Sequence, residues 1–84
     1  MHQPPQRLIR QAVAAFCGYM QSERLPPGRQ EDLRRKAERL AGRVTRSMGA
    51  KDDNERLMVW EEITHHAHRQ IESRRLKALG VEGY

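Results

Sequence analysis

The fold of this chain can be deduced from one stretch, residues 30–49, whose sequence is QEDLRRKAERLAGRVTRSMG. Apolar side chains recur along it every three or four positions, which is the period of an α-helix with one buried face. On a helical projection they fall within an arc of about 100°. Gly49 follows the last of them and predicts a left-handed C-terminal cap. The sequence therefore predicts a helix over 30–48 whose buried face consists of Leu33, Ala37, Leu40, Ala41, Val44 and Met48.

A second helix is expected over residues 5–22, where Pro5 suits the first helical turn because its backbone torsion is already close to helical. Apolar residues cover more than half of its circumference, which exceeds what one neighbouring helix can bury. This helix is therefore expected either to be central in the fold or to be shared with a second copy of the chain.

A third helix is expected over residues 53–79. Asp52 or Asp53 can cap its N-terminus, and Glu55 forms a capping-box pair with Asp52. It is the longest of the three, so its last two turns, from Arg74 on, should extend past the other helices. Its predicted buried face consists of Leu57, Trp60, Ile63, Ala67, Ile71 and Ala78.

These patterns predict a single all-α domain over residues 1–84, a small three-helix bundle with a long C-terminal helix. No stretch alternates polar and β-branched apolar residues with the period of two that a strand requires. Cys17 is the only cysteine, so a disulfide scaffold is excluded.

The composition excludes several classes of protein. The chain has 84 residues, 37% of them apolar, and a formal net charge of +5. No window approaches the ~20 apolar residues of a membrane span, and the N-terminus lacks the apolar core of a signal peptide, so a cytoplasmic protein is expected. A domain of this size has a thin core, and the chain lacks a glycine-rich phosphate loop and a serine triad. We therefore expect no enzyme, no cofactor and no small-molecule substrate.

The main functional candidate is a basic surface on the predicted helix 30–48, opposite its apolar arc. Arg39, Arg43 and Arg46 have no acidic residue three or four positions away. Their side chains are therefore free to bind phosphate or carboxylate oxygens. The competing interpretation is a charged face that only contacts solvent. The candidate residues are Arg35, Lys36, Arg39, Arg43 and Arg46, assisted by Arg74, Arg75 and Lys77 in the last helix.

The expected function is a non-enzymatic basic module that docks on nucleic acid or on the acidic protein surface of a nucleoprotein complex. A helix-turn-helix reader is disfavoured, because Asp52, Asp53 and Glu55 put negative charge where a recognition helix meets DNA. Few aromatic residues are available to stack on single-stranded bases. The remaining mode of nucleic-acid binding is one directed at the phosphate backbone.

The alternative is a protein–protein adaptor or inhibitor. Its interface would combine the wide apolar face of helix 5–22 with Leu76 and Leu79 at the end of the last helix. Surplus apolar surface of this kind marks sites of protein–protein interaction. A homodimer is the simplest complex that would bury it.

A third, remote hypothesis is a metal site. Glu61, His65 and His68 follow one another at i, i+4 and i+7 on the last helix and are weak candidates for zinc ligands. They are expected to face outward without a fourth ligand, so no metal is predicted. Cys17 is expected to be a core residue, remote from the histidines.

Overall fold

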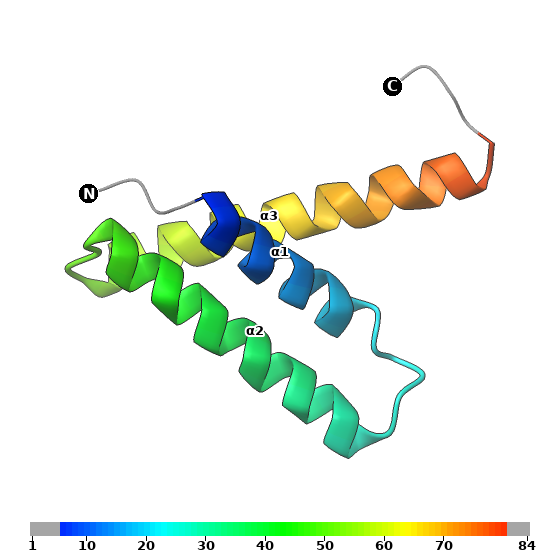
Figure 1. Cartoon of the computed structure of the whole chain (residues 1–84), viewed down its shortest axis with the longest axis horizontal. Helices are drawn as coiled ribbons and strands as arrows, with labels where there is room; N and C mark the ends of the chain where they lie inside the picture. Colours follow the sequence, from blue (N-terminus) through cyan, green and yellow to red (C-terminus); the bar gives the residue numbers. More distant parts are fainter. Residues whose placement is uncertain (1–5, 81–84) are drawn as a thin grey trace.

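The computed structural model describes residues 6–80, which form the helices α1 (Gln6–Met20), α2 (Pro27–Met48) and α3 (Asp53–Ala78) (Figure 1). The prediction of an all-α three-helix bundle is confirmed, and the described residues contain no strand. α1 and α2 run antiparallel, side by side, and α3 crosses behind them (Figure 1). None of the helices described is both long and apolar enough to cross a membrane.

The helix bounds differ from the expected ones where prolines are involved. The expected start of the first helix at residue 5 lies outside the described residues, and α1 ends at Met20 rather than at 22. α2 begins at Pro27, three residues earlier than expected. Proline is well tolerated there, because the first helical N–H has no partner within the helix. Gln30 then fastens the preceding loop, since its Nε2 donates to the Leu25 carbonyl at 2.8 Å.

The C-terminus of α2 and the N-terminus of α3 carry the caps that the sequence predicts. Gly49 has φ 72° and ψ 32°, and its N–H donates to the Arg46 carbonyl while that of Ala50 donates to the Thr45 carbonyl. This pattern is a Schellman motif. Asp52 is the N-cap of α3 and accepts from the Glu55 N–H at 2.9 Å. The Glu55 carboxylate accepts from the Lys51 N–H rather than from that of the cap residue, so the capping box is shifted by one position.

α1 is the central helix, because it packs against both α2 and α3, which contact each other least. Each helix contributes one alanine that is fully buried: Ala12, Ala37 and Ala67 are all 0% exposed. Phe16 fills the space beside them, and its ring meets that of Trp60 edge to face at 4.8 Å between centroids. Leu8, Ile9, Ala15 and Met20 are partly buried against this core, so much of the wide apolar face of α1 is covered within the chain.

The buried face of α3 differs from the predicted one. Val59, Ile63 and Ala67 are buried, whereas Leu57 is 54% exposed and Ala78 is exposed. Val59, Ile63 and Ala67 are four positions apart, and each is rotated about the helix axis by about 40° relative to the one before it. A buried stripe with this drift suits a helix that crosses its neighbour obliquely, because ridges of residues four apart then fit into the neighbour's grooves.

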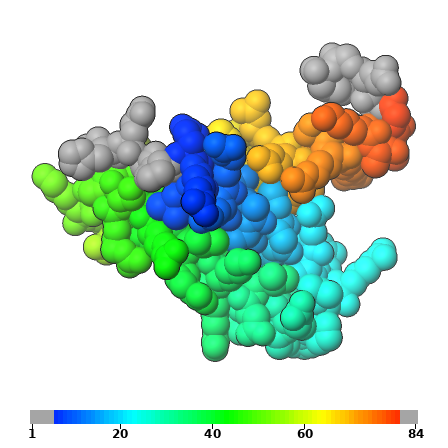
Figure 2. All heavy atoms as spheres, in the orientation of Figure 1, coloured from blue at the N-terminus to red at the C-terminus, as the bar shows by residue number. Residues whose placement is uncertain are grey.

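The C-terminal part of α3 extends past the other two helices and stands out from the body of the molecule (Figures 1 and 2). Ile71 is the last residue of α3 that packs against the core. Beyond it, Leu76 is half-buried and Leu79 is 68% exposed. This extended end places the last turns of α3 in solvent.

A matched pair of substitutions in α1 tests the packing. Ala12→Leu should destabilise the domain by about 1–3 kcal/mol or more, because the added side chain has no space at the helix contacts. Ala14→Leu, on the exposed side of the same helix, should change the stability by no more than about 0.5 kcal/mol. Urea denaturation followed by far-UV circular dichroism gives both free energies of unfolding. Equal costs for the two variants would contradict the packing described above.

Candidate nucleic-acid interface

All five basic residues predicted on the second helix are exposed on α2, away from its buried face of Ala37, Ala41 and Val44. Arg39, Arg43 and Arg46 are spaced by four and three, so they follow one another along a single face. We call these three residues the arginine stripe. From Arg39 to Arg46 it extends about 10.5 Å along the helix axis at ~1.5 Å per residue.

Arg34 binds two of the three carboxylates of α2. Its guanidinium donates to both oxygens of Glu31 and to Glu38, on the turns before and after it. Arg35 also donates to Glu31, at 3.3 Å between Nε and Oε1. Glu31 and Glu38 are thus engaged, and Arg35 shares Glu31 with Arg34.

The pairing of Arg34 with Glu31 shifts the pKa of both groups. The hydrogen bond from Arg34 holds the pKa of the Glu31 carboxyl below its usual value, and the charges of Arg34 and Arg35 act in the same direction. The same hydrogen bonds, to Glu31 and Glu38, raise the pKa of Arg34. Both side chains of the Arg34–Glu31 pair are 40% exposed, so water screens the pair and its contribution to stability is modest.

The arginine stripe differs in that none of its members forms an ion pair with a carboxylate of residues 6–80. Lys36, one turn before Arg39, likewise has no such partner within that range. Exposed guanidinium groups without a partner carry an uncompensated positive field and retain all their donors for a ligand.

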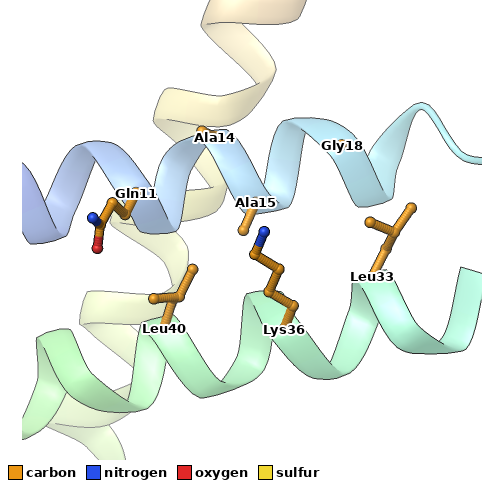
Figure 3. A pocket seen from close by; sticks show the side chains of 7 residues that line it. All are labelled: Gln11, Ala14, Ala15, Gly18, Leu33, Lys36 and Leu40. Carbon is orange, nitrogen blue, oxygen red and sulfur yellow. The ribbon is translucent and has the colours of Figure 1, made fainter.

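α1 extends the positive surface with a residue that the sequence-based prediction omitted. Gln11 faces Leu40 and Gly18 faces Leu33 across the two antiparallel helices (Figure 3). Arg7 lies one turn before Gln11 in α1 and is exposed. The sequence held a signal for this, because the segment of α1 contains two arginines and no acidic residue.

Arg74 and Arg75 are not brought together with the arginine stripe. They are exposed near the end of α3, whereas α2 ends beside the start of α3 (Figure 1). At ~1.5 Å per residue, Arg74 lies about 32 Å from the start of α3 at Asp53. Assistance from Arg74, Arg75 and Lys77 would therefore require a ligand that reaches past the whole domain.

The histidine cluster lies on the exposed side of α3. Glu61, His65 and His68 are all exposed, and no group of three metal-ligating side chains able to hold an ion occurs in residues 6–80. His66 pairs with Glu62 at 3.5 Å, which keeps this helix face occupied by local Glu–His contacts.

Cys17 lies in the core between α1 and α3. It is 3% exposed, and its Sγ is 3.5 Å from the Ala67 carbonyl oxygen and 3.8 Å from Gln70 Oε1. Both partners are acceptors, so the thiol donates and has no base beside it. This placement is that of a small buried apolar residue rather than of a nucleophile.

No protein-family model, no curated protein and no solved structure matches this chain. The chemistry of the surface is therefore the basis for the function proposed below.

Removal of Arg34 should release Glu31. In Arg34→Ala, the pKa of the Glu31 carboxyl should rise towards its usual value, because its main hydrogen-bond donor is lost and only Arg35 remains. A lowered carboxyl pKa stabilises the fold above the unfolded-state value, and this stabilisation is lost as the pH falls through the folded-state value. Side-chain carboxyl shifts in an NMR pH titration report the change. An unaltered Glu31 titration would show that Arg34 does not hold this carboxylate in solution.

Proposed function

We propose that this protein is a non-enzymatic binding module that docks on nucleic acid, alone or within a nucleoprotein complex, through the arginine stripe of α2. One observation carries the proposal: three exposed arginines share one face without a carboxylate partner in residues 6–80, while Arg34 engages the nearby glutamates. Arginine suits phosphate because its planar guanidinium donates two parallel hydrogen bonds.

The dimensions of the arginine stripe suit a phosphate backbone. Its length of about 10.5 Å corresponds to about three phosphates at ~3.4 Å per nucleotide along one strand. Arg7 on α1 can add a contact, since it is exposed on the neighbouring helix.

The mode of binding is backbone-directed rather than base-specific. Phe16 is buried and packs edge to face against Trp60, so only the Trp60 ring, which is 37% exposed and partly covered, could stack on a base. The start of α3 carries Asp52, Asp53 and Glu55, which repel the phosphates that flank a major groove. Both features support contacts to phosphate that tolerate any base sequence.

Binding should therefore depend steeply on salt. For a duplex contacted by three arginines, the logarithm of the association constant should fall by about 2.7 per tenfold rise in salt. The double variant Arg39→Glu/Arg43→Glu should lower this slope by about two-thirds and abolish binding at moderate salt, with the far-UV helix signal unchanged. Fluorescence anisotropy of labelled duplex DNA, single-stranded DNA and RNA across a salt series measures both quantities.

The control for net charge is Arg56→Glu/Arg69→Glu, which reverses two exposed arginines of α3. Either double variant lowers the formal net charge by four, from +5 to +1. If both variants lose binding equally, only the overall charge matters and the arginine stripe is not the site. If no nucleic acid binds even at low salt, the proposal fails altogether.

A second candidate function is a protein–protein adaptor or inhibitor, or a homodimer, and the extended end of α3 supports it. The supporting observation is Leu79, which is 68% exposed on turns that no other helix covers.

If this end is an interface, Leu79→Asp should weaken self-association by about tenfold or more, because a charge replaces an apolar contact. Sedimentation equilibrium over a range of concentrations measures the effect, and Ser73→Asp, at an exposed position on the same helix, is the control. A wild-type protein that stays monomeric at millimolar concentration would exclude the homodimer.

A further inference from the structure

We propose a second binding site, the groove between α1 and α2, which receives the apolar face of an acidic amphipathic helix from a partner protein. No residue of the arginine stripe lines this site, although Arg43 lies at its rim, and the inference does not depend on nucleic-acid binding. The groove has a volume of about 580 Å³. It is lined by Gln11, Ala14, Ala15 and Gly18 of α1 and by Leu33, Lys36 and Leu40 of α2 (Figure 3).

The groove exists because small side chains of α1 lie opposite long side chains of α2. Ala14, Ala15 and Gly18 occupy little space, whereas Leu33 and Leu40 form a half-buried apolar wall. A Cβ atom added at Gly18 would have no neighbouring atom within 4 Å, so the space above this residue is open. The α1–α2 contact is thus closed on the core side and open towards solvent.

The dimensions and lining favour aliphatic side chains on a helix. Leu33 and Leu40 are seven residues apart, which is about 10.5 Å along α2. The anchors of an amphipathic helix at i, i+3 or i+4, and i+7 have the same spacing. No aromatic side chain lines the groove, so nucleic-acid bases would find no stacking surface there.

The charges around the groove select an acidic partner. Lys36 is its one charged lining residue, and its side chain extends from α2 towards Ala15 (Figure 3). Arg29 and Arg43 lie seven residues before and after Lys36, on the same side of α2, and both are exposed.

Few carboxylates oppose these cations. α1 contains no acidic residue, and Glu31 and Glu38 are bound by Arg34. Asp32, beside Leu33, is the only acidic residue of α2 that does not bind Arg34. An apolar floor within a positive rim is complementary to a helix with leucines on one face and glutamates on its flanks.

The test uses a designed helical peptide of about 15 residues, with leucines at i, i+4 and i+7 and glutamates on both flanks. A peptide of the same composition in scrambled order is its control. Titration of isotopically labelled protein should shift the amide signals of Gln11, Ala15, Gly18 and Leu40, and anisotropy of the labelled peptide gives the dissociation constant. The scrambled peptide should bind at least about tenfold more weakly.

Gly18→Leu should weaken peptide binding at least about tenfold, because the new side chain fits the open space and fills the groove. Gly28→Leu is the matched control, since Gly28 is also exposed with open space around its Cβ position but lies outside the groove. A second variant, Lys36→Glu, should weaken binding by charge repulsion without filling the groove. The far-UV helix signal of each variant verifies the fold.

The inference is overturned if the peptide does not bind at millimolar concentration, if the scrambled peptide binds equally, or if both Gly18→Leu and Lys36→Glu bind like the wild type. A further double variant, Arg39→Glu/Arg46→Glu, separates the two proposals. This variant should lose nucleic acid and retain most of the peptide affinity, because Arg39 and Arg46 do not line the groove and the rim cations Arg29, Lys36 and Arg43 remain.

Discussion

The complete burial of one alanine in each helix is the constraint on which the rest of this structure depends. Ala12, Ala37 and Ala67 have no exposed surface, and α1 packs against both other helices. These small side chains fill little of the core, so most of its volume is supplied by larger residues such as Phe16. With α1 buried from two directions, its apolar surface stabilises the fold, and the surfaces left for partners are the outer sides of α2, the α1–α2 groove and the extended end of α3.

The charge distribution on α2 follows from this packing. One side of the helix is buried, so its many charged residues share the remaining circumference, and those on neighbouring turns must either pair or remain free. Arg34 binds Glu31 and Glu38, which removes both carboxylates from competition with the arginine stripe. A basic helix thereby acquires one neutralised segment and one segment whose arginines are available to anions. The pairing within α2 is thus as important for the proposed function as the unpaired residues are.

Sequence periodicity predicted the fold and the buried face of α2 because that helix has apolar residues on one side only. It was only partly right on α3, where Ile63 and Ala67 are buried as predicted. Leu57, Met58, Val59 and Trp60 are consecutive and point in different directions, so that only the packing of α3 against the other helices selects Val59 for burial. The arginine stripe was visible from spacing alone, since i, i+4 relations lie within one helix. The α1–α2 groove was not, because it depends on the register that sets Gly18 against Leu33 across two helices.

The position of Cys17 has a consequence for the cooperativity of the fold. Its thiol is covered by α3, through Ala67 and Gln70, while α2 and α3 contact each other least of all the helix pairs. α3 is therefore joined to the rest of the fold mainly along α1. Detachment of α3 would expose Cys17 to solvent, because Ala67 and Gln70 would no longer cover its thiol. The single thiol of the chain is thus a built-in reporter for the opening of α3.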